Sequence, residues 1–188
     1  MGVDLNIRVY KYNVKTNLYD ELVIYRRRKP DEKFKGYDEE GNGIPYEDAY
    51  RPIYIEAGRN YEMFEGMKDG DSTDGYCDFP KTSVALNSFN PEARAKLEEY
   101  MSKGYGYDFC EISLAEMKLY VNEHPTVVDY DSPAWTDDDF HKVGSERPQK
   151  TNPIKHLYND IYNYIWIAED CWMWEPLSYY KVVFYWDC

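Results

Sequence analysis

The residues of this sequence best suited to chemistry are a few carboxylates together with one arginine and one asparagine. Paired carboxylates with an arginine can transfer protons or hold a phosphate group. The candidates for such a polar site are Asp4, Arg59, Asn60, Asp108 and Glu111. Around them the sequence has no nucleophile–base pair, no metal-ligand spacing and no glycine-rich phosphate loop. Asp4 and Arg59 are equally suited to a structural ion pair beside a helix cap, so an enzyme is the least favoured of three hypotheses and no catalytic residue is assigned.

The sequence predicts neither a metal nor a cofactor. Its four cysteines and three histidines are dispersed without a close pair, so neither a zinc site nor a disulfide framework is indicated. The acidic stretch that begins at Asp69 matches a calcium loop only in part. Asp69 and Asp71 suit the first two ligand positions, but Pro80 stands where the closing glutamate belongs.

The chain is strongly acidic, and its charge is unevenly distributed. It carries 22 basic and 35 acidic residues, which gives a net charge of -13. Residues 1–30 have a surplus of positive charge, whereas residues 31–80 are rich in Asp and Glu. Such a chain repels nucleic-acid backbones, so we expect no direct nucleic-acid binding and instead attraction to a basic protein surface. Simple solubility explains the acidity equally well.

Two acidic stretches form the predicted partner surface. One follows Gly66, and the other surrounds the aromatic residues Trp135 and Phe140. An aromatic pair among aspartates is typical of a protein contact, and packing against the chain's own domain is an equal alternative. The predicted contact residues are Asp69, Asp71, Asp74, Trp135, Asp137, Asp138 and Asp139.

The remaining hypothesis is a pocket for an anionic nucleotide signal. Arginines can bind its phosphate groups, and some of the 21 tyrosines can stack on its base. The residues predicted to form this pocket are Arg26, Arg27, Arg28, Arg59 and Asn60. A basic cluster at an exposed strand end is more often a charged guard against edge-to-edge pairing.

Sequence patterns predict an α+β fold in which an antiparallel sheet of about four strands carries helices mainly on one face. Alternating or β-branched segments place the strands at residues 3–12, 18–27, 53–56 and 179–187, with the first and last strands as neighbours. We expect one domain, residues 1–188, with a long acidic loop at 31–48 and an irregular insertion at 126–151. We expect no membrane contact, because no apolar segment reaches the length of a membrane span and no export signal is recognised.

Capping residues predict where the helices begin. A side-chain oxygen at the N-cap accepts a hydrogen bond from an otherwise unpaired backbone N–H of the first turn. Such starts are predicted at Asn60, Asn90, Ser113 and Asn152. Ser113 and Glu116 form a capping box, and the helix after Asn152 carries an apolar stripe over residues 154–168.

Three short motifs resemble a group of uncharacterised bacteriophage proteins. They are Met1-Gly2-Val3-Asp4-Leu5, Gly58-Arg59-Asn60-Tyr61-Glu62-Met63-Phe64 and Ser113-Leu114-Ala115-Glu116-Met117. The chain departs from the group at Tyr107-Asp108-Phe109-Cys110-Glu111, where many members have His-Ser-His-Ser. The resemblance implies a phage origin and no particular activity. With no export signal recognised and the cysteines dispersed, the expected location is the cytoplasm of the host cell.

Acidity and the implied phage origin together lead to the principal hypothesis. A small acidic phage protein is suited to occupy the basic nucleic-acid-binding surface of a host defence enzyme, with its carboxylates in place of phosphates. The expected partner is therefore a basic host protein that handles nucleic acid, and the chain is expected to act as its inhibitor.

Overall fold

The computed structural model describes residues 4–27, 50–57, 63, 67, 79–102, 109–173 and 175–187. The chain divides into two compact units, of which the first comprises Met1–Leu22 and Ile55–Cys188 and the second comprises Val23–Tyr54. The prediction of one domain over residues 1–188 stays a prediction. The predicted acidic loop at 31–48 lies outside the described residues.

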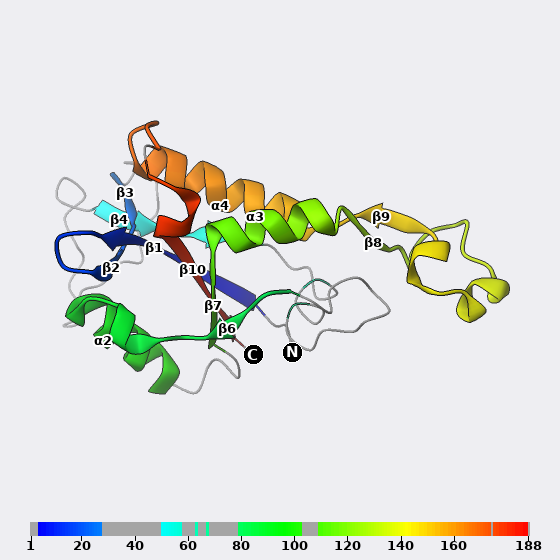
Figure 1. Cartoon of the computed structure of the whole chain (residues 1–188), viewed down its shortest axis with the longest axis horizontal. Helices are drawn as coiled ribbons and strands as arrows, with labels where there is room; N and C mark the ends of the chain where they lie inside the picture. The colour runs from blue at the N-terminus through cyan, green and yellow to red at the C-terminus, as the bar shows by residue number, and fades with distance from the viewer. Residues whose placement is uncertain are drawn as a thin grey trace. The chain divides into compact units, whose positions relative to one another are not determined.

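The first unit contains an antiparallel sheet in the order β2-β1-β10-β7-β6, with β5 also paired to β1. Its strands are β1 (Asp4–Asn13), β2 (Leu18–Glu21), β5 (Ile55–Glu56), β6 (Thr82–Ser83), β7 (Phe109–Ser113) and β10 (Tyr180–Asp187). β1 and β10 pair along eight residues, from Asp4 opposite Asp187 to Lys11 opposite Tyr180 (Figure 1). The predicted α+β class is confirmed, and the first and last strands are neighbours as expected.

Two predicted strands are each divided by a break. Residues 18–27 form β2 and then β3 (Ile24–Arg27), and β3 pairs with β4 (Tyr50–Ile53) in a separate two-stranded sheet of the second unit. The predicted strand 53–56 is likewise divided between β4 and β5. Residues 22–25, Leu-Val-Ile-Tyr, are a continuous run of strand-forming residues across the break, so the pattern could not reveal that the chain changes its pairing partner there.

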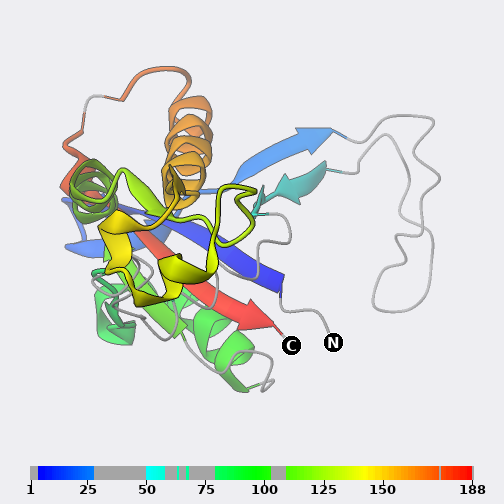
Figure 2. The ribbon, with the colours of Figure 1, turned by 90° about the vertical axis from the view of Figure 1, so that its right-hand side faces the viewer.

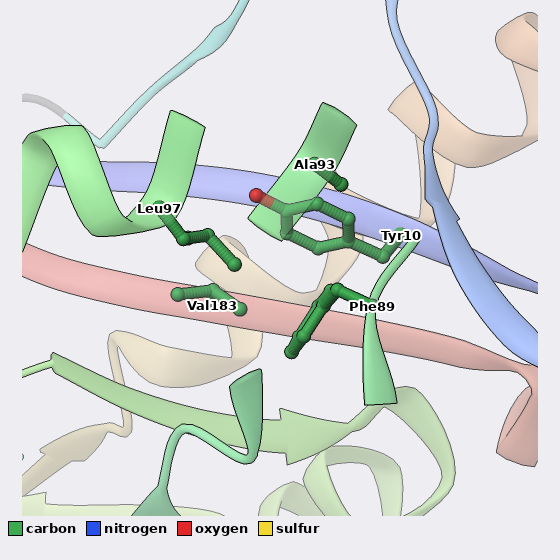
Figure 3. Packing of buried hydrophobic residues seen from close by; sticks show 5 residues of the cluster. All are labelled: Tyr10, Phe89, Ala93, Leu97 and Val183. Atoms are coloured by element: carbon green, nitrogen blue, oxygen red, sulfur yellow. The ribbon is translucent and has the colours of Figure 1, made fainter. Parts of the chain in front are cut away.

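Among the described residues, the α-helices α2, α3 and α4 cover the sheet of the first unit on both faces (Figures 1 and 2). α3 (Leu114–Glu123) and α4 (Ile154–Ala168) pack together on one face, as predicted. α2 (Pro91–Ser102) covers the opposite face, which the prediction of helices mainly on one face did not include. Figure 3 shows the core beneath α2, where Ala93 and Leu97 meet Tyr10, Phe89 and Val183. Short 3-10 turns, η2 (Leu86–Ser88) and η5 (Leu177–Tyr179), precede α2 and β10.

The three capping predictions that fall on described residues are confirmed. Asn90 Oδ1 accepts the Ala93 N–H at 2.7 Å, and Asn152 Oδ1 accepts the Ile154 N–H at 3.0 Å. Ser113 and Glu116 form both hydrogen bonds of a capping box. The predicted cap Asn60 lies outside the described residues, while Met63 and Met67, which follow it, are helical and buried.

The predicted irregular insertion is an ordered arm, residues 126–151, between α3 and α4 (Figures 1 and 2). Its ends are two paired strands, β8 (Thr126–Val128) and β9 (Gln149–Thr151). Between them lie the 3-10 helices η3 (Asp137–His141) and η4 (Gly144–Glu146). Strands of three residues and turns of three to five are too short to give a detectable periodicity, which is why the sequence suggested no regular structure. Among the helices that the structure describes, none has the length and apolar character to cross a membrane.

Candidate functional site

The arm folds around a small aromatic cluster of its own. The Trp135 ring lies 5.2 Å from that of Tyr130 and 5.6 Å from that of Phe140, and the Phe140 contact is edge-to-face. The Arg147 guanidinium carbon lies 5.9 Å from the Trp135 ring centroid. Arg147 also donates hydrogen bonds to the carbonyl oxygens of Lys142 and Phe140 at 2.9 and 3.5 Å, and to the Tyr130 hydroxyl at 3.4 Å. These contacts fix the arm from within, since the aromatic and cation–π contacts join residues from both of its halves.

The three consecutive aspartates of η3 do not share one role. Asp139 is only 3% exposed, and its Oδ2 accepts hydrogen bonds from the backbone N–H and the hydroxyl of Thr136. Its Oδ1 pairs with Lys142 Nζ at 2.6 Å. The Lys142 ammonium and then the Thr136 backbone N–H lower the pKa of Asp139 to about 2. Asp139 therefore stabilises the arm from inside and, contrary to the prediction, does not belong to its outer surface, whereas Asp137 and Asp138 are exposed.

Each lysine and arginine of the arm has a partner within it, whereas three of the six carboxylates, those of Asp131, Asp137 and Asp138, form no hydrogen bond or ion pair among the described residues. The arm contains three basic residues, of which Lys142 pairs with Asp139, Lys150 lies 3.7 Å from Asp129, and Arg147 holds the aromatic cluster. The exposed carboxylates of the arm are those of Asp131, Asp137, Asp138 and Glu146. Lys142, whose side chain is 43% exposed, is the most exposed lysine or arginine of the arm, so the outer surface of the arm has a net negative charge.

Large apolar side chains are exposed beside these carboxylates. Phe140 is 65% exposed and Val143 is 74% exposed, while Trp135 is half-buried beneath them in the cluster. Trp135 was predicted as a contact residue, but it supports the surface more than it forms it. Exposed aromatic and aliphatic groups surrounded by charged groups are typical of protein interaction sites.

Most of the other predicted site residues lie outside what the structure describes. This applies to the predicted contact residues Asp69, Asp71 and Asp74 and to Arg28, Arg59, Asn60 and Asp108. Arg26 and Arg27 lie in β3, opposite Arg51 and Tyr50, and the backbone of Asp4 begins β1. The positions of their side chains are outside the described part as well, so the anion pocket and the polar site around Asp4 stay predictions.

Glu111, a candidate for acid–base chemistry, forms a buried ion pair instead. Its Oε1 lies 2.7 Å from Lys181 Nζ, and the two side chains are 9% and 12% exposed. Glu111 Oε2 accepts the Ala85 N–H at 3.1 Å, and Lys181 also donates to Ser88 Oγ at 3.2 Å. The ammonium group lies 4.4 Å from the Tyr19 ring centroid. Both charges are satisfied by the strands and turns that they connect, which indicates a structural role.

A hollow of about 330 Å³ lies beside the β1–β2 hairpin, and no sequence pattern indicated it. Its lining includes two lysines and three carboxylates, those of Lys11, Lys15, Asp20, Glu21 and Glu175. Most of these groups already have partners, because Lys11 pairs with Glu169 at 2.6 Å and Glu21 pairs with Lys96 at 3.1 Å. Asp20 accepts hydrogen bonds from Asn13 and Asn90. A lining with more carboxylates than amines does not favour an anionic ligand.

No metal-binding group of three or more His, Cys, Asp or Glu side chains occurs within the part of the chain that the structure describes. Comparison with known proteins finds no matching protein family, no matching curated protein and no matching solved structure. The geometry of the arm is therefore the basis for assigning a role, and the resemblance to bacteriophage proteins stays a prediction.

Proposed function

We propose that this chain is an acidic binding protein that attaches to a basic protein surface through the outer face of its arm. The observation that supports this proposal best is the separation of charges in the arm. Lys142, Arg147 and Lys150 are engaged within the arm, while four carboxylates face solvent beside Phe140 and Val143. A surface of this kind attracts a positively charged partner over a distance and offers apolar area once contact is made.

The internal contacts of the arm strengthen the proposal. An arm that is fixed before binding loses little conformational entropy on association, so more of the interaction energy remains as affinity. The aromatic cluster and the Asp139–Lys142 pair provide this rigidity without using the outward carboxylates. The arm is thus suited to recognise a partner of defined shape.

The finer proposal concerns the source of the chain and its target. We propose that it is phage-encoded, acts in the cytoplasm of the host cell, and inhibits a defence enzyme by occupying its basic nucleic-acid-binding surface. The net charge of -13 and the sequence resemblance support this. Carboxylates can substitute for backbone phosphates in such a groove because both present negative oxygens to Lys and Arg.

Capture from a bacterial host lysate tests the proposal. The bait variants are the wild type, the arm variant D137K/D138K and the control variant E92K/D160K. Glu92 and Asp160 are exposed residues of α2 and α4, so the control makes the same change in net charge away from the arm. Binding is measured between about 0.1 M and about 1 M salt, which shortens the Debye length from about 10 Å to about 3 Å.

The expected result is a basic, nucleic-acid-handling protein that the wild type and the control variant retain at low salt and release at high salt. The arm variant is expected to retain it poorly at any salt concentration. Equal capture by all three variants would show that the arm is not the binding surface. Capture that does not depend on salt would exclude an electrostatic interface.

A further inference from the structure

The register of η3 places one outward carboxylate next to the exposed aromatic ring. In a 3-10 helix the side chains of residues i and i+3 lie above one another. Asp139 and Lys142, the C-terminal cap of η3, have this spacing, and their side chains are in contact at 2.6 Å, as the register allows. The same spacing aligns Asp137 with Phe140, whereas Asp138 aligns with His141. Asp137 and Phe140 therefore form a single exposed edge of the arm.

This edge combines the two groups that bind a guanidinium ion most favourably. Guanidinium is planar, so it can stack on an aromatic ring while its N–H groups donate to a carboxylate, whereas an ammonium group is a compact and strongly hydrated charge. The arm already holds one guanidinium near an aromatic ring, with carbonyl and hydroxyl oxygens in place of a carboxylate as acceptors. Arg147 lies 5.9 Å from the Trp135 ring centroid and donates to three oxygen atoms around it.

We infer that the edge formed by Asp137 and Phe140 recognises an arginine side chain on the partner. This inference rests on the proposed function, because it names the chemical group that the acidic arm selects on a basic surface. The guanidinium stacks on the Phe140 ring, which is 65% exposed, and donates to the Asp137 carboxylate. Asp138 and Glu146 add negative charge without distinguishing arginine from lysine.

Two synthetic peptides of equal length and charge test the inference. They are acetyl-(Gly-Arg)4-amide and acetyl-(Gly-Lys)4-amide, titrated into the full-length chain while the indole N–H signal of Trp135 is followed by NMR. The signal is assigned with the variant W135F. We expect the arginine peptide to bind at least about threefold more tightly than the lysine peptide, the difference that a solvent-exposed cation–π contact supplies.

Matched variants distinguish the specific contribution of Asp137 and Phe140 from that of the general negative charge of the arm. F140A and D137N are expected to remove most of the preference for arginine, whereas V143A and D138N retain it. Val143 is an apolar arm residue that is 74% exposed, and Asp138 is the adjacent carboxylate outside the edge, so each matches its counterpart in chemistry and exposure. Retention of the other indole signals verifies that each variant is folded.

Failure of the inference can be distinguished from failure of the proposed function. Equal affinity of the two peptides for the wild type, or an undiminished preference for arginine in F140A, overturns the inference while leaving the acidic surface in place. If neither peptide binds, or if D137K/D138K binds both as well as the wild type does, the proposed function fails together with it.

Discussion

Substitution of Asn152 by alanine is expected to destabilise the whole arm-bearing side of the first unit. Asn152 is fully buried at the base of the arm, where its side chain connects two helices. Its Oδ1 accepts the first-turn N–H of Ile154 at 3.0 Å, and its Nδ2 donates to the carbonyl oxygen of His124, the C-terminal cap of α3, at 2.9 Å. Its backbone N–H donates to Pro125 at 3.0 Å, and alanine retains that bond.

The expected loss follows from the two side-chain hydrogen bonds. Removing an N-cap side chain costs about 1 kcal/mol, within a range of about 0.5 to 2. The hydrogen bond to His124 contributes about 1 kcal/mol, and its part-buried carbonyl oxygen then loses this donor, which adds up to a similar amount. We therefore expect N152A to lower the free energy of unfolding by about 2 to 3 kcal/mol. The free energy of unfolding falls by about 2 kcal/mol per M urea, so the urea concentration at the midpoint of unfolding decreases by about 1 to 1.5 M.

Urea unfolding followed by far-ultraviolet circular dichroism measures this loss. N152S is the matched control, because serine supplies a capping oxygen but no amide donor for His124, and about half of the lost stability should return. A loss below about 0.5 kcal/mol for N152A would refute the reasoning, since it lies under the range for a single lost cap. Equal losses for N152A and N152S would show that the cap contributes nothing at this position.

Three further predictions concern buried polar groups. K181M leaves the Glu111 carboxylate buried without its cation, so urea unfolding should show a loss of about 3 to 5 kcal/mol, with a smaller loss for K181M/E111L. The Tyr180 hydroxyl is buried and has no hydrogen-bond partner among the described residues, so Y180F should leave stability unchanged or raise it by about 1 kcal/mol, whereas a clear loss in the same assay would contradict this. The pKa of Asp139 falls from 3.8 to about 2 on folding, so its contribution to stability is complete above about pH 4 and disappears as the pH falls toward 2. The NMR signal of the Trp135 indole N–H should shift as Asp139 is protonated between about pH 4 and 2. In D139N this signal should change little over the same pH range.

Local signals in the sequence predicted much of the scaffold. The alternation in residues 3–12 and the β-branched run at 179–187 identified β1 and β10, because a strand with a buried face shows its period directly. The capping side chains of Asn90, Ser113 and Asn152 located the first turns of α2, α3 and α4. Each of these signals acts within a few residues, so it can be recognised without knowledge of the remaining chain.

Pairing between distant segments was not predictable in the same way. Nothing in the pattern around Leu22 indicates that β2 pairs with β1 while β3 pairs with β4. The choice of partner depends on how the whole sheet is arranged, and the run of strand-forming residues 22–25 continues through the break without a turn signal. The burial of Glu111 beside Lys181 has the same origin, because the two residues are 70 positions apart and meet only through the pairing of β7 with β10.

The three aspartates at 137–139 show why composition could locate the candidate site but not resolve it. As a sequence they are one acidic run, yet the 3-10 register directs one toward Lys142, one toward the Phe140 side and one toward His141. The run therefore contains one structural residue and two surface residues with different neighbours. A charge count treats these three as equivalent, although only the outward pair can contribute to an attractive field at the surface.

The same reasoning distinguishes the arm from the acidic residues of the scaffold. On the sheet and α2, Glu21, Glu98 and Glu111 each form an ion pair with a lysine or arginine, so their charges are largely compensated where they stand. In the arm the basic groups contact Asp139, Asp129 and the Trp135 ring, and the Lys142 side chain is still 43% exposed. The scaffold also has exposed carboxylates without an ion pair, such as Glu123 of α3 and Asp160 of α4, so uncompensated charge alone does not distinguish the arm. What distinguishes it is that exposed carboxylates and the exposed Phe140 and Val143 side chains occur in one short segment, a combination that favours recognition of a cationic partner over simple solubility.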